Sequence, residues 1–139
     1  MKKILVCHDG SKASDKALKK AVEIVTRFEG SITVLSVIPE LYLTELSEVD
    51  RRRIVQALTE ETNIALEKVR ASLAGKSIEA KIILRQGEPA EKILETAKKM
   101  KVDLVVVGSH GRHGARKFLL GSVSSRVVEN ATCPVLVVK

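Results

Sequence analysis

The segment from Val105 to Val128, "VVVGSHGRHGARKFLLGSVSSRVV", concentrates the residue types of this chain that could do chemistry. Its loop combines closely spaced glycines with His110, His113 and three basic side chains. Such a combination could hold a metal ion, a reacting substrate or a phosphate group. The spacing of the residues decides among these three uses.

Metal chelation and covalent catalysis both fit this spacing poorly. His110 and His113 lack the one-turn helical repeat of a zinc pair, no Cys or acidic residue lies in the segment, and the nearby basic residues repel cations. A nucleophilic serine would be expected in a G-x-S-x-G elbow, which does not occur here. Serines beside glycines more often form turns and helix starts.

Anion binding fits the same segment better. Gly108 ends an apolar run, Gly111 and Gly114 allow the backbone to approach a ligand closely, and Gly121-Ser122 opens a helical pattern. The free N–H groups and the dipole at a helix start favour negative charge. The Walker pattern G-x-x-x-x-G-K-[ST] and the dinucleotide pattern G-x-G-x-x-G are both absent. The alternative is a flexible glycine-rich connection with ordinary helix caps.

Length and composition indicate one domain, residues 1–139, with 45% hydrophobic residues. The net charge of +7 is spread among acidic residues, and one Tyr and two Phe offer few stacking rings, so nucleic-acid binding is not expected. No stretch approaches the roughly 18 apolar residues of a membrane span, and no signal-peptide core is present. We expect a soluble, cytoplasmic protein in which Cys7 and Cys133 stay reduced.

Five short apolar, β-branched runs alternate with segments of helical periodicity. The runs predict strands at 3–7, 31–37, 77–84, 103–108 and 134–138. The first helix starts at a Ser11 or Ser14 cap and ends at Gly30, the second spans about 47–74, the third starts at Pro89, and the fourth runs from Ser122 until Pro134 stops it. This order predicts an open parallel sheet with helices on both faces, which binds ligands at the carboxyl ends of its strands.

The helical segments carry apolar stripes that should face the sheet. Their members are Ala17, Leu18, Ala21, Val22, Val25 and Phe28, then Ile54, Leu58, Ala65, Val69 and Leu73, then Ile93, Leu94 and Ala97, and finally Val123, Val127, Val128 and Ala131. The third strand alternates apolar with charged residues, whereas the first, fourth and fifth are continuously apolar. We therefore expect the third strand at an edge of the sheet.

The spacing Gly108-x2-Gly111-x9-Gly121-Ser122 resembles the nucleotide-binding signature of the universal stress protein family. The resemblance covers the whole chain, because "KKILVCHDGSKAS", "VLSVIPE", "GEPAEKIL" and "SVSSRVVENATCPVLVVK" also fall where that family has them. It implies a flavodoxin-like, adenine-nucleotide α-hydrolase-like sheet with strand order 3-2-1-4-5. Members with this glycine pattern bind ATP.

The resemblance also implies a role for particular residues. Asp9 and Val37 are expected at the adenine or ribose, with the backbone near Cys7 and Val107; Gly108, His110, Gly111, Gly121 and Ser122 at the ribose and phosphates; Val123 through its amide; and Ser124 near a Mg²⁺ or Mn²⁺ ion that accompanies the nucleotide. His113 is expected in solvent with Arg112, Arg116 and Lys117. The alternative is that Asp9 only stabilises the turn in "HDGS" and does not contact a ligand.

Two residues depart from the family pattern. Cys7 stands where some relatives have Ala or Pro, and His8 stands where a small or apolar residue is common. His8 is either packed or solvent-facing without a role, or it shapes the adenine pocket.

The function expected from these features is an ATP-binding stress-response or signalling module, in which ATP, ADP or AMP alters association with an unknown protein partner. Because no acidic residue that could position a water lies near the phosphate loop, we expect ATP hydrolysis to be slow at most. The alternative is an ATP-dependent ligase or nucleotidylyl transferase, which needs a further substrate pocket. In the strand order that the resemblance implies, the apolar fifth strand, "PVLVVK", lies at a sheet edge, and many family members dimerise through it, so we expect a homodimer. The alternative is that helices cover this strand and Lys139 blocks pairing.

Overall fold

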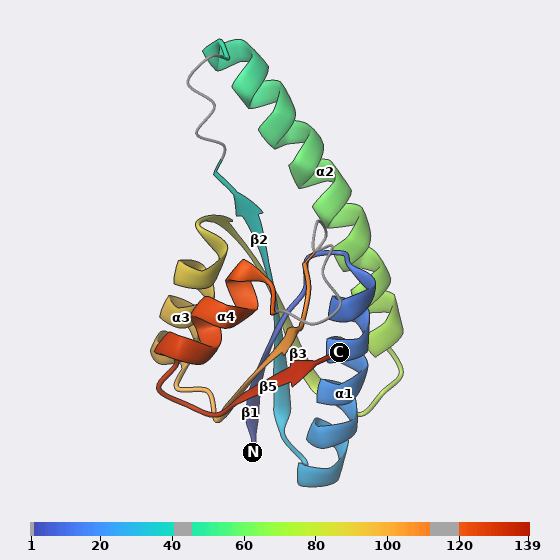
Figure 1. Ribbon diagram of the computed structural model, residues 1–139. Helices are drawn as coiled ribbons and strands as arrows, with labels where there is room; N and C mark the ends of the chain where they lie inside the picture. The colour runs from blue at the N-terminus through green and yellow to red at the C-terminus, as the bar shows by residue number, and fades with distance from the viewer. Residues whose placement is uncertain (1, 41–45, 112–119) are drawn as a thin grey trace.

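The computed structural model describes residues 2–40, 46–111 and 120–139, which form alternating strands and helices (Figure 1). The elements are β1 (Lys3–Cys7), α1 (Lys12–Phe28), β2 (Ser31–Pro39), α2 (Glu48–Leu73), β3 (Glu79–Gly87), α3 (Pro89–Met100), β4 (Leu104–Gly108), α4 (Ser122–Asn130) and β5 (Val135–Val138). Every strand and helix expected from the sequence is present. The largest displacement is that of β3, which the sequence places at 77–84.

All strand pairs are parallel, and the strand order is β3-β2-β1-β4-β5, as the resemblance implies. The alternating strand β3 lies at an edge, which confirms that expectation. The helices α1 and α2 cover one face of the sheet, and α3 and α4 cover the other (Figure 1).

The core has two halves because neighbouring strand residues point to opposite faces of the sheet. Ile4 and Val106 pack with the α1 and α2 side, whereas Leu5 and Val105 pack with the α3 and α4 side. All four side chains are almost fully buried. Burial of each stabilises the fold by about 1.5–3 kcal/mol, which explains why β1 and β4 read as continuously apolar runs.

The ends of α1 refine the sequence prediction. Ser11 rather than Ser14 is the N-cap, since its side chain accepts a hydrogen bond from the Ser14 amide. At the other end, Glu29 and not Gly30 adopts the left-handed conformation, with φ of 52°. Gly30 is required for a different reason, because a Cβ there would collide with the backbone carbonyl of Lys2.

Two apolar residues expected to face the sheet are exposed instead. Phe28 is the last residue of α1 and remains 53% exposed. Val128 is 44% exposed because its neighbour Val127 takes the inward position on α4, and adjacent helical residues point in different directions. The helix α4 also ends at Asn130, ahead of Pro134.

The helix α2 is longer than the strands it covers. Its 26 residues span about 39 Å, whereas the nine residues of β2 span about 30 Å. The N-terminal part of α2 therefore extends past the sheet (Figure 1). Only Leu66, Val69 and Leu73 are buried on it, so Ile54, Leu58 and Ala65 are less buried than the sequence predicts. None of the helices in the described ranges is both long and apolar enough to cross a membrane.

Candidate functional site

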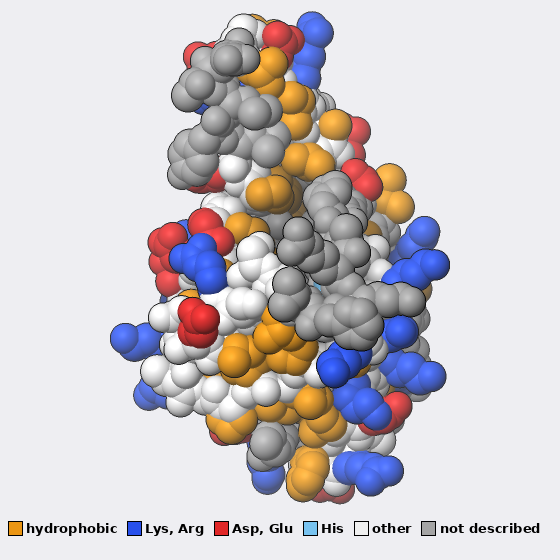
Figure 2. Space-filling model, in the orientation of Figure 1, with side chains coloured by type: hydrophobic (Ala, Val, Ile, Leu, Met, Phe, Trp, Pro, Cys, Tyr) orange, Lys and Arg blue, Asp and Glu red, His pale blue; other side chains and the backbone are white. Residues whose placement is uncertain are grey.

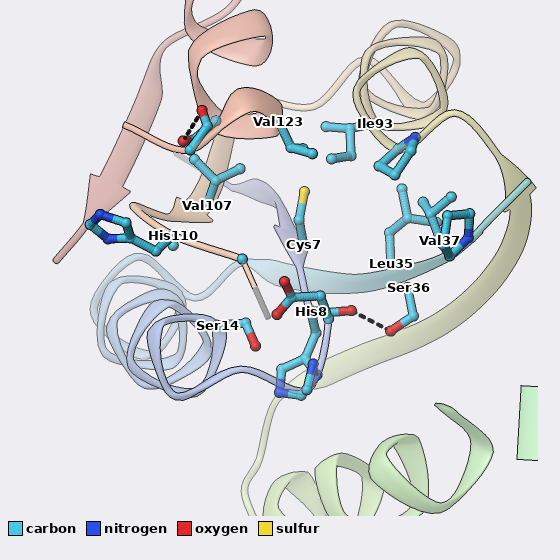
Figure 3. Close-up of a pocket in the computed structure, with 18 of the residues that line it drawn as sticks. Cys7, His8, Ser14, Leu35, Ser36, Val37, Ile93, Val107, His110 and Val123 are labelled. Carbon is cyan, nitrogen blue, oxygen red and sulfur yellow. Dashed lines mark hydrogen bonds between the residues drawn. The ribbon is translucent and has the colours of Figure 1, made fainter. Parts of the chain in front are cut away.

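A cavity of about 420 Å³ opens at the carboxyl ends of β1, β2 and β4 (Figure 3). This volume is within the usual range for small-molecule sites. All residues assigned to a site from the sequence line it, namely Cys7, Asp9, Val37, Val107, Gly108, His110, Gly111, Gly121, Ser122, Val123 and Ser124. The fold thus brings together residues from four separate segments of the chain.

One end of the cavity is apolar. The side chains of Cys7, Val107, Val123 and Ile93 converge there from β1, β4, α4 and α3 (Figure 3). Burial raises the pKa of the Cys7 thiol, and the negative charge of Asp9 raises it further. The thiol therefore stays neutral at physiological pH and contributes a weakly polar surface, not a nucleophile or a metal ligand.

The strand β2 exposes backbone hydrogen-bonding groups beside this apolar end. In a parallel ladder, both backbone groups of a residue point to one neighbouring strand, and the next residue points to the other. The Leu35 carbonyl accepts a 2.9 Å hydrogen bond from the His8 amide, so Leu35 faces β1. Val37 faces the same side, but the pairing of β1 with β2 ends at Leu35. The N–H and C=O of Val37 are therefore directed toward the cavity.

The start of α4 forms another part of the cavity wall. The Ser109 carbonyl accepts hydrogen bonds from the Gly121 amide at 2.8 Å and from the Ser124 hydroxyl at 3.2 Å, which ties α4 to the end of β4. No side chain among the described residues caps α4, and its first turn contains no acidic residue. By contrast, Ser11, Ser47 and Glu88 cap the other three helices. The first amides of α4 thus present an uncapped, positively polarised helix end.

The surroundings of the signature glycines differ, so a side chain would have a different effect at each position. A Cβ on Gly108 would lie 2.8 Å from the backbone and side chain of Ala13, so close packing of β4 against α1 requires a glycine. A Cβ on Gly111 would lie 3.0 Å from Oδ2 of Asp9. A Cβ on Gly121 would approach no described atom closer than 3.4 Å, which is an ordinary contact. Packing against the described residues therefore does not explain why Gly121 lacks a side chain.

Asp9 forms the turn considered for it from the sequence and also lines the cavity. Its Oδ1 accepts a 2.9 Å hydrogen bond from the Ser11 amide, which is the Asx-type turn expected at this position. Its other carboxylate oxygen faces Gly111, and the residue lines the cavity. The turn thus holds the carboxylate at the cavity.

His8 is packed and hydrogen-bonded through both ring nitrogens. Its exposed fraction is 4%, and Nε2 lies 2.8 Å from Oδ1 of Asp15. The Gly10 amide donates to Nδ1 at 3.3 Å. Because Nδ1 accepts, the network assigns the hydrogen to Nε2, which donates to Asp15. The sequence left open whether His8 is packed or faces solvent, and the solvent-facing alternative is wrong.

His110 is half-buried at the edge of the cavity, and its Nδ1 lies 2.8 Å from the Ser109 hydroxyl. The remaining loop residues singled out from the sequence, Arg112, His113, Gly114, Arg116 and Lys117, lie outside the described residues.

The sequence profile of the universal stress protein family matches residues 1–139. The chain belongs to the universal stress protein family. It is 38% identical over 139 residues to universal stress protein MJ0531 of Methanocaldococcus jannaschii, covering 99% of this chain and 82% of that protein.

Solved structures of universal stress proteins share the fold. The UspA protein of Lactobacillus plantarum superimposes with a TM-score of 0.91 at 28% identity, over 99% of this chain and 97% of that one. The protein MJ0577 of Methanocaldococcus jannaschii gives 0.87 at 33%, over 99% and 95%. An Arabidopsis thaliana member has the same fold at 23% identity and a TM-score of 0.71, over 100% and 92%, and its structure contains AMP.

Sequence reasoning missed one wall of this universal stress protein's cavity. Leu58, Thr62 and Ala65 of α2 line it, together with Leu35, Ser36, Pro39, Pro89 and Ile93. The sequence pattern places Leu58 and Ala65 on the stripe that faces the sheet, and this prediction is wrong. Because α2 extends past the sheet, these two residues face the cavity. Leu58, Thr62 and Ala65 are spaced as on one helical face. The sequence therefore shows that they lie together, but it does not show that this face borders a cavity.

The charges around the cavity are sparse. Asp9 is the one carboxylate among its described lining residues, which include no Lys or Arg. Within the described parts of this universal stress protein, no three His, Cys, Asp or Glu side chains are grouped so that they could hold a metal ion. Among the described lining residues, the groups that could hold a negatively charged ligand are backbone amides, hydroxyl groups and His110.

Proposed function

We propose that the cavity binds an adenine nucleotide, either ATP or its relatives ADP and AMP, and that the protein is a nucleotide-dependent stress-response or signalling module. One observation supports this proposal most strongly. The residues of the family's nucleotide signature line a single cavity, whose wall includes an apolar slot and an uncapped helix start. The AMP in the Arabidopsis thaliana member is consistent with such a ligand.

The apolar end suits an adenine base. Cys7, Val107 and Val123 offer apolar surface for the faces of the ring. The N–H and C=O of Val37 present one donor and one acceptor, which complement N1 and the N6 amino group of adenine. Guanine presents a carbonyl and an N–H at those positions, so the same pair of groups would disfavour it.

The start of α4 suits the phosphates. The amides of Ser122 and Val123 and the Ser122 hydroxyl are available donors, and the helix dipole favours negative charge. The described lining residues include no Lys or Arg to neutralise the negative charge of the phosphates. A Mg²⁺ or Mn²⁺ ion would neutralise that charge. We assign Ser124 to that ion, since its single hydroxyl hydrogen is shared between the carbonyls of Gly121 at 3.0 Å and Ser109 at 3.2 Å, and the oxygen keeps its lone pairs for a metal.

Rapid phosphoryl transfer is not part of this proposal. It requires a positioned nucleophile and neutralised charge, and Asp9, the one carboxylate among the described lining residues, is assigned by the family resemblance to the adenosine end. We therefore propose slow hydrolysis at most. A ligase or nucleotidylyl transferase would turn over ATP rapidly once its second substrate is supplied, and a metabolite panel tests that alternative.

We also propose a cytoplasmic homodimer that forms through β5. This strand pairs with β4 on one side and is the edge of the sheet, and all four of its residues are half-buried. Hydrophobic side chains gather over β5 on the face in Figure 2. An apolar edge strand favours pairing with another chain. Light scattering should give twice the monomer mass, and a monomer at every concentration would contradict the dimer.

Calorimetry with purified protein tests nucleotide binding. ATP and AMP should bind, GTP should bind more weakly, and Gly111→Val should abolish binding because its side chain would enter the space beside Asp9. Circular dichroism should confirm that the variant is folded. Absence of ATP and AMP binding by the wild type, or unaltered binding by the folded variant, would contradict the assignment.

A further inference from the structure

A second cavity of about 400 Å³ lies between α1 and α2, next to the first. Leu18, Ile64 and Val69 give it an apolar lining, and Asp15 and Lys68 add charge. Three residues line both cavities, namely His8, Gly10 and Ala65. Because glycine has no side chain and alanine has a single methyl group, His8 is the one bulky side chain shared by the described walls.

The His8 ring is held rigidly in this position. Asp15 accepts a hydrogen bond from Nε2, and Nδ1 accepts one from Gly10, so rotation about either side-chain bond would break both contacts. Figure 3 shows the ring directed away from Cys7 and toward α2. The ring is also almost completely buried, which leaves it no solvent-facing alternative. A fixed ring between two cavities is a partition.

We propose that His8 is a specificity-determining residue that closes the nucleotide cavity toward α1 and α2. This proposal rests on the proposed function and adds a limit on the ligand. The cavity accepts adenine nucleotides without a large substituent on the base and excludes those with a ring-sized apolar substituent directed at His8. Removal of the ring would connect the two cavities, and the apolar surface of Leu18, Ile64 and Val69 would receive the substituent.

The experiment compares ATP with three analogues that carry a benzyl or phenyl group at N6, C2 or C8. Affinities are measured by calorimetry for wild type, His8→Ala and His8→Phe, and each analogue is expressed relative to ATP in the same protein. For at least one analogue that the wild type rejects, His8→Ala should raise this ratio by about tenfold or more, the scale on which apolar pockets discriminate size. His8→Phe restores ring volume without the hydrogen bonds and should keep the wild-type ratio.

Ser72→Ala is the matched control, since Ser72 lines the second cavity away from the partition and its substitution should leave every ratio unchanged. If His8→Ala lacks a cooperative melting transition, His8→Val replaces it and retains more packing. No gain for any analogue in a folded small-residue variant, or an equal gain in His8→Phe, overturns the partition. Failure of the wild type to bind ATP would instead contradict the proposed function.

Discussion

Gly121 and Gly108 belong to the same signature, and the structure predicts opposite consequences for the same substitution at each. In Gly108→Ala, the new Cβ would lie 2.8 Å from the backbone of Ala13, and overpacking of this kind costs about 1–3 kcal/mol. In Gly121→Ala, the new Cβ meets no atom of the described residues closer than 3.4 Å, and φ of −62° suits alanine.

The stability of Gly121→Ala should remain close to that of the wild type. Alanine is a poorer N-cap than glycine, but it also restricts the unfolded chain by about 0.4–1 kcal/mol, so the two effects nearly cancel. The binding of nucleotide should fall, because the methyl group would separate the phosphates from the first amides of α4. Loss of one hydrogen bond to a charged group costs about 1.5–3 kcal/mol, equivalent to roughly 10–150-fold in Kd.

Urea denaturation and ATP titration of both variants measure these effects separately. Gly108→Ala should unfold at lower urea, whereas Gly121→Ala should unfold near the wild-type midpoint and bind ATP at least about tenfold more weakly. Wild-type affinity in Gly121→Ala would refute the position assigned to the phosphates. A loss of stability in Gly121→Ala as large as in Gly108→Ala would show that packing, and not a ligand, requires the glycine.

Three further predictions concern groups around the site and the sheet. The raised pKa of Cys7 predicts that its alkylation rate, followed by mass spectrometry, keeps rising above about pH 8.5, the ordinary thiol value, and a plateau there would contradict it. The pKa of Asp103 is lowered, first by the backbone hydrogen bond from Lys3, so its contribution to stability is present above about pH 4 and lost as pH falls through the lower folded value. The difference in unfolding free energy between wild type and Asp103→Asn should therefore shrink in acid, and a constant difference would contradict this. Glu88 caps α3 and pairs with Arg126 at 2.9 Å, so Glu88→Ala should cost about 1 kcal/mol in urea denaturation and Arg126→Ala should cost less, because the ion pair is exposed. Equal losses would assign the effect to the ion pair.

The arrangement of the sheet was predictable because short-range patterns determine it. Continuous apolar runs identified the buried strands, and the alternation of Ile78, Ala80 and Ile82 with Glu79 and Lys81 identified the edge strand β3. The glycine spacing from Gly108 to Gly121, together with the family resemblance, selected residues that line one cavity. These features depend on the local chain or on a motif of fixed spacing.

The contacts between distant segments were not predictable. The periodicity of α2 gave its apolar positions but not its extension past the sheet, so the cavity wall formed by Leu58 and Ala65 was missed. The pair of His8 with Asp15 joins the end of β1 to the first turn of α1, and neither residue type nor spacing indicates that their side chains meet. The direction of Val128 likewise depends on which neighbour faces the sheet.

The most direct test of nucleotide binding at this cavity is a titration of the ¹⁵N-labelled protein with ATP, followed by backbone amide chemical shifts. Nucleotide binding at this cavity predicts saturable shifts at Val37, Ser122 and Val123, which line it. Absence of shifts with ATP, or shifts confined to residues away from this cavity, would contradict it.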